Sequence, residues 1–283
     1  MIKLGLIGYP LSHSMSAVIH NAAFASTGVE GTYEILETDP ESLISRVKYL
    51  KANGFSGFNV TIPHKVPITL FLDQVDNISN IAGCANTVKI MNDKSLTGYN
   101  TDVFGFLEAV PKNIRESLEG KSVAILGNGG AARAAAVAFA QVRVKKIDFY
   151  VRNIINASSM VSIVRSTFPD IQIVSKQIQH INDLSEYSMV VNTTPIGMRS
   201  KAMDLSPVDC SALSTMNKSA IVYDIVYNPI KTELIKIAQK QGLQTIGGLD
   251  MLVHQAAKAF EIWTDKKPDA CQMKVAALEH LMS

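Results

Sequence analysis

The stretch GFNVTIPHK, residues 57–65, combines an amide, a hydroxyl and a lysine within a few positions. Asn59 and Thr61 are two residues apart, so in a strand their side chains point to the same face. Lys65 follows directly after the strand that these apolar residues predict, and Asp102 in the later motif NTD supplies a carboxylate. A lysine and an aspartate that meet in a cleft hold each other's charge and can pass a proton to a substrate oxygen. The pair therefore predicts acid–base chemistry.

Each member of this pair also has a simpler interpretation. Asp102 could be the N-cap of a helix that starts at Val103. Lys65 could be a solvated lysine after a proline turn. Three histidines lie nearby in the sequence, His13, His20 and His64. They lack the spacing of metal ligands, so no metal site is expected from them.

More polar side chains lie at the ends of other predicted elements. Ser14 and Ser16 stand at the start of the first predicted helix. Two hydroxyls beside free backbone N–H groups can bind a carboxylate. The alternative is that one of the serines is the N-cap of this helix. Asn86 ends the turn CANT. Gln255 lies on an apolar helical stripe, where its amide needs either a ligand hydroxyl or a partner on another helix. Amides and hydroxyls together predict a polyhydroxylated ligand.

A glycine-rich turn, GNGGAA, follows a buried strand and opens an alanine-rich helix. Gly127 permits the tight turn, Gly129 lets the backbone approach a pyrophosphate, and Ala132 keeps the helix close to the sheet. The helix N-terminus then presents N–H groups to the phosphates. This context predicts a dinucleotide site, and the alternative is a helix start that binds nothing. The predicted contacts are Gly127, Asn128, Gly129, Gly130, Ala131 and Ala132.

The end of the next strand indicates which dinucleotide is bound. A cofactor with a free 2′-hydroxyl is usually held there by an acidic residue, but this chain reads DFYVRN, with Arg152 and Asn153 in that place. A guanidinium can pair with a 2′-phosphate through two N–H groups, whereas a carboxylate would repel it. The sequence therefore favours NADP. A solvated surface arginine is the alternative for Arg152.

The elements that must position these residues predict an α/β fold of two domains. Strands are expected at 2–8, 32–36, 57–62, 85–91 and 96–100, with helices at 15–27 and 40–54 and a hairpin formed by the last two strands. From Lys121 onward, further strands are expected in KSVAIL, KKIDFYVRN, IQIV, YSMVVNTT, AIVYDIVY and LQTIGG, with helices at 155–167 and 230–241. This alternation predicts an open α/β unit followed by a doubly wound parallel sheet. Two final helices, 249–263 and 268–283, are expected to return to the first unit.

Composition limits the partners. The 283 residues carry a formal net charge of only +2 and no basic block, which argues against nucleic acid. No apolar run is long enough to span a membrane. Three scattered cysteines and a start that does not resemble a signal peptide predict reduced thiols and a cytoplasmic protein. The oligomeric state stays open, a homodimer included.

Taken in order, these motifs resemble the shikimate dehydrogenase family over nearly the whole chain. The family's opening motif is present as PLSHSMS, with Ala17 where proline is usual, and is followed by NVTIPHK, ANT and NTD. VNTTPIGM, DIVYNP and GLDMLVHQ then follow the glycine turn in the family's order. Several motifs in one order are far more specific than any single motif.

The resemblance implies an enzyme that reversibly reduces 3-dehydroshikimate to shikimate with NADPH, in aromatic amino-acid biosynthesis. It implies a substrate-binding and catalytic domain of residues 1–102 joined by helices 249–283, and a Rossmann-type NADP-binding domain of residues 103–248 with a linker helix. The catalytic pair would be Lys65 and Asp102. The substrate would contact Ser14, Ser16, Asn59, Thr61, Lys65, Asn86, Asp102, Tyr227 and Gln255. The nicotinamide side would be lined by Thr193, Thr194, Met198, Ile225, Gly248 and Met251.

The chain departs from the family where Asn-Arg-Thr usually follows the second strand of the cofactor domain. Val151 and Asn153 flank the retained Arg152 here. The alternatives are a dual shikimate/quinate dehydrogenase that uses NAD and a non-catalytic sensor of nucleotide and metabolite. A methylene-tetrahydrofolate dehydrogenase also pairs such domains, but the NTD motif and the serine pair argue against it.

Overall fold

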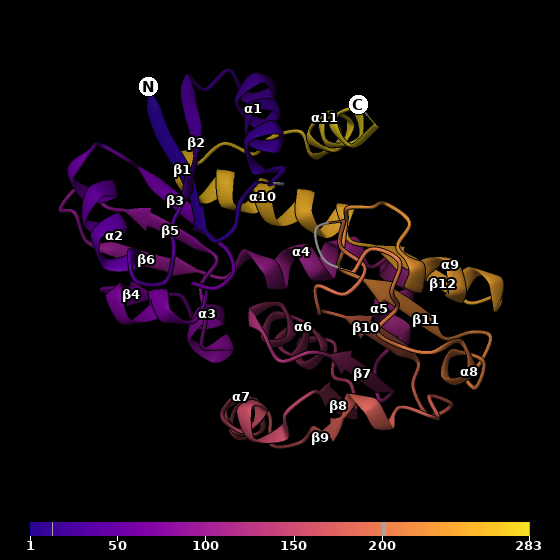
Figure 1. Ribbon diagram of the computed structural model, residues 1–283. Helices are drawn as coiled ribbons and strands as arrows, with labels where there is room; N and C mark the ends of the chain where they lie inside the picture. Colours follow the sequence, from indigo (N-terminus) through magenta and orange to yellow (C-terminus); the bar gives the residue numbers. More distant parts are fainter. Residues whose placement is uncertain (13, 200–201, 283) are drawn as a thin grey trace. The chain divides into compact units, whose positions relative to one another are not determined.

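The chain forms two compact units, each built on a six-stranded sheet, in a computed structural model that describes residues 1–12, 14–199 and 202–282 (Figure 1). Unit 1 comprises Met1–Gly105 and Val253–Ser283, and unit 2 comprises Phe106–Leu252. The predicted boundaries at 102 and 248 each fall a few residues before these divisions. Both units are α/β, which confirms the predicted fold class. His13 lies outside the described residues.

Unit 1 has a mixed sheet with the strand order β2-β1-β3-β5-β6-β4. Its strands are β1 (Ile2–Gly8), β2 (Gly31–Glu37), β3 (Gly57–Val60), β4 (Gln74–Val75), β5 (Thr87–Ile90) and β6 (Leu96–Tyr99). β1 lies parallel to β2 and β3, whereas β5 is antiparallel to both β3 and β6. The antiparallel β5–β6 pair confirms the predicted hairpin. The two-residue edge strand β4 is too short to show a periodicity in the sequence.

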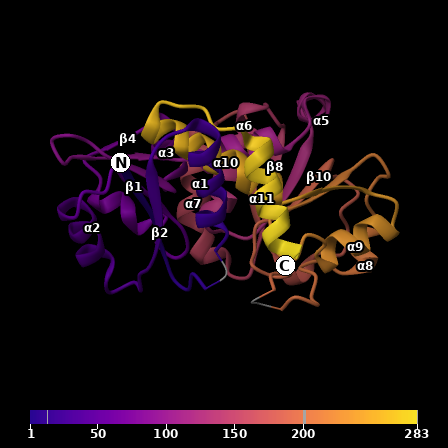
Figure 2. The same cartoon turned by 90° about the horizontal axis from the view of Figure 1, so that it is seen from above.

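The helices of unit 1 include both helices of the C-terminal segment. They are α1 (Ser16–Thr27), α2 (Leu43–Ala52), the 3₁₀ helix η1 (Pro67–Phe71), α3 (Asn77–Ala82), the start of α4 (Thr101–Ala109), most of α10 (Leu249–Thr264) and α11 (Ala270–Met282). α11 packs against α1, as the top view also shows (Figure 2). The predicted return of the C-terminal helices to this unit is therefore confirmed.

The end of α10 is fastened to strand β5 by two hydrogen bonds. The indole Nε1 of Trp263 donates to the carbonyl of Val88 at 2.9 Å, and Lys89 Nζ donates to the carbonyl of Ile262 at 2.6 Å. Gly57 on β3 makes this approach possible, because an added Cβ would lie 2.2 Å from the indole Nε1. The fastened helix carries Gln255.

Unit 2 has an entirely parallel sheet with the strand order β12-β11-β10-β7-β8-β9. Its strands are β7 (Ser122–Leu126), β8 (Lys146–Val151), β9 (Gln172–Gln177), β10 (Met189–Asn192), β11 (Ile221–Asp224) and β12 (Gln244–Gly247). This order is that of a doubly wound dinucleotide-binding sheet, with its switch point between β7 and β10. Buried apolar runs such as Val123–Leu126 suit strands that helices cover on both faces.

Helices connect the strands of unit 2. They are α5 (Lys112–Ser117), α6 (Gly130–Gln141), α7 (Ile154–Thr167), η2 (Ile178–His180), α8 (Cys210–Leu213) and α9 (Glu233–Lys240). Asn153 caps α7, and Thr232 caps α9 by accepting from the N–H of Ile235. α9 is therefore shorter than the predicted helix 230–241, because its cap sets where it begins. The short helices α5 and α8 were not predicted.

Candidate active site

Lys65 and Asp102 form an ion pair in unit 1, with 2.5 Å between Lys65 Nζ and Asp102 Oδ2. Their side chains are 17% and 6% exposed. Asp102 lies in the first turn of α4, which begins at Thr101. The alternative of Asp102 as the cap of a helix starting at Val103 is therefore wrong. A carboxylate in a first turn is favoured by the helix dipole, and this one also holds the ammonium group in place.

Asn86 connects the pair to the rest of unit 1. Its Nδ2 donates to Asp102 Oδ1 at 2.8 Å and to Gln255 Oε1 at 3.3 Å. Its Oδ1 accepts from the backbone N–H of Thr101 at 2.8 Å. Three segments that are distant in the sequence thus meet at one amide. Because Asn86 is only 2% exposed, the orientation of its amide is set by these contacts.

Asn59 is also buried, and protein groups occupy all of its hydrogen-bonding positions. Its Oδ1 accepts from Tyr33 Oη at 2.7 Å and from His20 Nε2 at 3.1 Å. Its Nδ2 donates to the carbonyl of Asn86 at 3.2 Å and to Thr87 Oγ1 at 3.0 Å. The sequence alone gave no indication that Tyr33 or Thr87 would join this cluster.

The serine pair does not cap α1 as one interpretation had it. Met15 is the N-cap residue and makes no side-chain cap bond, while Ser14 Oγ accepts from the backbone N–H of Ser16 at 3.3 Å. Both serines are half-buried. Thr61, also half-buried, follows β3, where its backbone N–H donates to the carbonyl of Ile7 at 2.9 Å. The geometry keeps both serine hydroxyls available as part of a polar site.

The glycine turn of unit 2 has the conformation that the motif predicts. Gly127 follows β7 with φ at +110°, and an added Cβ would lie 2.8 Å from Thr193 Oγ1, so the position requires glycine. An added Cβ on Gly129 would have no described atom within 4 Å. Ala132 is fully buried beneath the first turn of α6. The turn thus combines a tight bend with open space at a helix N-terminus, which fits a pyrophosphate.

Residues expected at the nicotinamide side follow the strands next to this turn. Thr193 follows β10 and donates through its hydroxyl to the carbonyl of Leu126 at 2.6 Å. Ile225 follows β11, and Gly248 follows β12; an added Cβ on Gly248 would lie 2.0 Å from the carbonyl oxygen of Ile225. The other residues expected near the ligands also lie in unit 2, in loops or in the first turn of α10: Thr194, Met198, Tyr227 and Met251.

Arg152 and Asn153 follow β8, the strand beside β7. Arg152 is exposed and makes no ion pair with another described residue. Asn153 Oδ1 accepts from the backbone N–H groups of Ile155 and Asn156 at 2.9 and 3.3 Å. Its carbonyl oxygen thus serves the helix, which leaves its Nδ2 group for a ligand.

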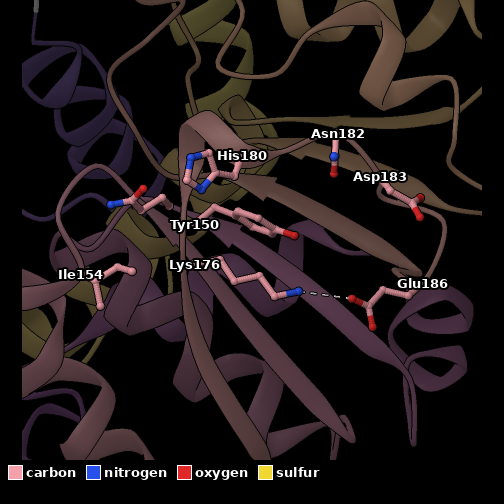
Figure 3. Close-up of a pocket in the computed structure, with 8 residues that line it drawn as sticks. Tyr150, Ile154, Lys176, His180, Asn182, Asp183 and Glu186 are labelled. Carbon is pink, nitrogen blue, oxygen red and sulfur yellow. Dashed lines mark hydrogen bonds and ion pairs between the residues drawn. The ribbon is translucent and has the colours of Figure 1, made fainter.

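A pocket of about 560 Å³ lies in unit 2 beside β8 and β9 (Figure 3). It is lined by Tyr150, Ile154, Lys176, Gln177, His180, Asn182, Asp183 and Glu186. Lys176 points toward Glu186 across it, and its Nζ also lies 2.7 Å from the buried carboxylate of Asp148. Because this ammonium is paired within the protein, it does not present an uncompensated positive charge to a ligand.

The part of the chain that the structure describes has no candidate metal centre and no candidate membrane-spanning helix. No group of three or more His, Cys, Asp or Glu side chains there could hold a metal ion. No helix there is long and apolar enough to cross a membrane.

The fold and the site define a class of protein, an α/β oxidoreductase with a Rossmann-type dinucleotide unit and a separate unit that carries a lysine–aspartate pair. Two family models match: the shikimate dehydrogenase substrate binding domain over residues 6–88 and the shikimate 5′-dehydrogenase C-terminal domain over residues 248–278. The chain is 39% identical over 273 residues to the NADP(+) shikimate dehydrogenase of Methanococcus maripaludis, covering 96% of this chain and 95% of that protein. The chain belongs to the shikimate dehydrogenase family.

Solved structures share the whole fold. A crystal structure of shikimate dehydrogenase in complex with NADP+ has a TM-score of 0.88 and 33% identity, covering 100% of this chain and 96% of that chain. Quinate dehydrogenase from Corynebacterium glutamicum in complex with NAD has the same TM-score of 0.88 with 30% identity, covering 98% and 99%. The fold alone therefore does not distinguish the two specificities.

Proposed function

We propose that this chain catalyses the reversible NADPH-dependent reduction of 3-dehydroshikimate to shikimate. The observation that carries the proposal is the Lys65–Asp102 ion pair, bonded to Asn86 at the strand ends of unit 1. The same chain contains a glycine turn suited to a dinucleotide in unit 2. A carbonyl reduction needs both a source of hydride and a group that protonates the oxygen.

The lysine–aspartate pair supplies the acid–base part of this reaction. Bound NADPH supplies the hydride. The Lys65 ammonium stabilises the negative charge that develops on the carbonyl oxygen and gives that oxygen a proton, so that the ketone becomes an alcohol. Asp102 keeps the ammonium aimed at this position and balances its charge. In the reverse direction Lys65 accepts the proton of the hydroxyl.

Polar groups around the pair give the substrate its orientation. Ser14 and Ser16 bind the carboxylate end through hydroxyl groups at the start of α1. Thr61, Asn86 and Gln255 bind the ring oxygens, because amides and hydroxyls can both donate to and accept from them. Asp102 contributes an acceptor to the same ring. These groups match a small, polyhydroxylated carboxylic acid.

The cofactor assignment depends on backbone shape and one cation. The turn from Gly127 to Ala132 holds the pyrophosphate, and the residues after β10, β11 and β12 line the nicotinamide. Arg152 pairs with the 2′-phosphate, a role that its exposed position and lack of an ion pair with any described residue support.

Three broader statements follow as proposals. Unit 1 is the substrate-binding and catalytic domain, and unit 2 is the NADP-binding domain. The protein acts in the cytoplasm, which its three cysteines support, because none of them forms a disulfide. It acts on a small molecule, and a homodimer is the assembly proposed for it.

A second function, oxidation of quinate with NAD, is favoured by two observations. The quinate dehydrogenase structure is as similar in fold as the shikimate dehydrogenase structure. Val151 and Asn153 also replace the residues that usually flank the arginine in the family.

The experiment that separates these functions is a measurement of initial rates with the purified protein. Shikimate and quinate are each combined with NADP and NAD, and formation of the reduced cofactor is followed. Fast turnover only with shikimate and NADP supports the proposed function. Comparable rates with quinate or NAD favour the second function, and binding without turnover would contradict both.

A further inference from the structure

We propose that Tyr33, Asn59 and Thr87 are positioning residues for the Lys65–Asp102 pair, acting through a buried chain of hydrogen bonds that ends on Asp102. This inference rests on the proposed function, because it explains how the proposed catalytic pair is held. It also changes the expected role of Asn59 from substrate contact to support of Asn86.

The direction of the first amide in this chain is set by its neighbours. The carbonyl oxygen of Asn86 can only accept a hydrogen bond, so the group of Asn59 that faces it at 3.2 Å must be Nδ2. Asn59 Oδ1 then faces Tyr33 Oη and His20 Nε2, which donate to it. The second N–H of Asn59 Nδ2 points to Thr87 Oγ1 at 3.0 Å.

Thr87 connects Asn59 to the amide of Asn86 and keeps the same donor-to-acceptor direction. Its hydroxyl accepts from Asn59, so its single proton is available for Asn86 Oδ1 at 3.1 Å or for Thr101 Oγ1 at 3.2 Å. Asn86 Oδ1 must be an acceptor, because the backbone N–H of Thr101 faces it at 2.8 Å. With the Thr87 proton on Asn86 Oδ1, Thr87 connects the two amides.

The last bond brings the chain to the catalytic carboxylate. Asn86 Nδ2 donates to Asp102 Oδ1 at 2.8 Å, while Asp102 Oδ2 is held by Lys65. From Tyr33 through Asn59, Thr87 and Asn86, every donor then points toward Asp102. Hydrogen bonds aligned in this way polarise one another, and the last of them favours a negative charge on the carboxylate.

Burial makes this chain a means of positioning. Tyr33, Asn59 and Thr87 are 8%, 6% and 0% exposed. Water therefore has poor access to a group that has lost its partner. A buried donor or acceptor that is left without a hydrogen bond destabilises the folded protein more than the loss of a solvent-exposed hydrogen bond does.

Thr87→Val tests the link that joins the two amides, because valine keeps the shape and removes the hydroxyl. We expect kcat with shikimate and NADP to fall on the order of tenfold, since about one buried hydrogen bond is lost. The KM for shikimate should change much less, because Thr87 does not contact the ligand. Thr87→Ser restores the hydroxyl and should return kcat to near the value of the unaltered protein.

Thr38→Val is the matched control, because Thr38 is a buried threonine of unit 1 whose hydroxyl bonds elsewhere, to the carbonyl of Leu36. It should leave kcat unchanged, and thermal unfolding curves of all variants show whether each is folded. If Thr87→Val does not fold, Tyr33→Phe removes the first donor of the same chain and should lower kcat in the same sense.

The outcomes separate this inference from the function on which it rests. Turnover by the unaltered protein together with full kcat in folded Thr87→Val would overturn the positioning role. Equal loss in Thr87→Val and Thr87→Ser would also overturn it, because the hydroxyl would then not be the relevant group. Absence of turnover in the unaltered protein would instead contradict the proposed function.

Discussion

Unit 1 and unit 2 bury polar side chains in different ways. In unit 1 a series of neutral amides and hydroxyls leads to one ion pair at the carboxyl ends of the strands. In unit 2 the buried carboxylate of Asp148 receives bonds from Lys176 at 2.7 Å, Lys146 at 3.1 Å and Tyr187 at 2.6 Å. The first arrangement leaves a reactive pair at its end, whereas the second neutralises its own charge inside the unit.

The difference follows from what each unit is proposed to bind. A ring with several oxygens is oriented by side chains, so unit 1 gathers amides and hydroxyls from several strand ends. A dinucleotide is held largely by backbone and shape, so the key positions of unit 2 are Gly127, Gly129 and Ala132. In unit 2 the buried carboxylate of Asp148 instead joins β8 to β9 through Lys176.

The largest effect is expected at the end of the unit 1 network. Lys65→Ala should lower kcat by about 10²–10⁴-fold, because the developing alkoxide loses its proton donor. Shikimate affinity, measured by calorimetry, should stay within a few-fold of the original. Lys48→Ala, which alters an exposed lysine of the same unit, is the control and should keep full activity. Near-normal turnover in Lys65→Ala would show that the pair is structural.

An intermediate effect is expected in unit 2, where the exposed cation of Arg152 is proposed to supply cofactor specificity. Arg152→Ala should weaken NADP binding by about ten- to a hundredfold, since charged hydrogen bonds to a phosphate are lost. NAD binding should change little, because NAD has no 2′-phosphate. Fluorescence titration of both cofactors measures the two affinities. As a control, Lys145→Ala removes another exposed cation of unit 2 and should weaken the binding of neither cofactor. If Arg152→Ala weakened NADP and NAD binding equally, Arg152 would not be the residue that binds the 2′-phosphate.

A third effect concerns stability, and it has opposite signs in the two units. Burial lowers the pKa of His20 to about 3, partly offset by the hydrogen bond with Asn59, so the folded ring stays neutral. The contribution of His20 to the free energy of unfolding is complete above pH 6.5, its ordinary pKa, and is lost as the pH falls toward 3. The limiting slope of this loss is roughly 1.4 kcal/mol per pH unit.

Asp224 in unit 2 acts in the other direction. Burial raises the pKa of this carboxyl from 3.8 to about 6, partly offset by bonds from Thr232, Val226 and Asn192. The contribution of Asp224 to the free energy of unfolding is complete below pH 3.8 and is lost as the pH rises toward 6. The two groups therefore oppose each other over that interval.

His20→Phe should separate these contributions, because phenylalanine keeps a ring against Tyr33 and cannot be protonated. Between pH 6.5 and 4, urea unfolding should show a smaller loss of stability on acidification than in the unaltered protein. His180→Gln replaces an exposed histidine and should leave the pH dependence as it was. An unchanged slope in His20→Phe would mean that His20 is not the group that is titrated.

The sequence predicted much of what lies at the strand ends. Lys65 and Asp102 do meet, because residues that follow β3 and β6 are brought to one edge of the sheet. Asn86 joins them from the start of β5, which is antiparallel to both strands, and Gln255 joins them from α10. The glycine turn was predictable for a similar reason, since its residue types follow from backbone conformation. The two-unit α/β architecture followed from the alternation of strand and helix periods.

The residues that hold the site in place through hydrogen bonds could not be predicted from the periodicity of the sequence. Tyr33 occupies an ordinary inward position of β2, and His20 lies on the buried face of α1, so each resembles a core residue. Their hydrogen bonds to Asn59 depend on the order β2-β1-β3, which local periodicity does not determine. The serine cap interpretation failed because Met15, which lies between the two serines, is the N-cap residue of α1, which begins at Ser16.

The central claim is that the two units serve one hydride transfer to a carbonyl protonated by Lys65. It is tested most directly by incubating the protein with 3-dehydroshikimate and NADPH in which both hydrogens at the reactive carbon of the nicotinamide are replaced by deuterium. The account predicts shikimate that carries deuterium on the ring carbon that bore the carbonyl, as measured by mass spectrometry and NMR. Shikimate formed without deuterium at that carbon, or no shikimate at all, would contradict it.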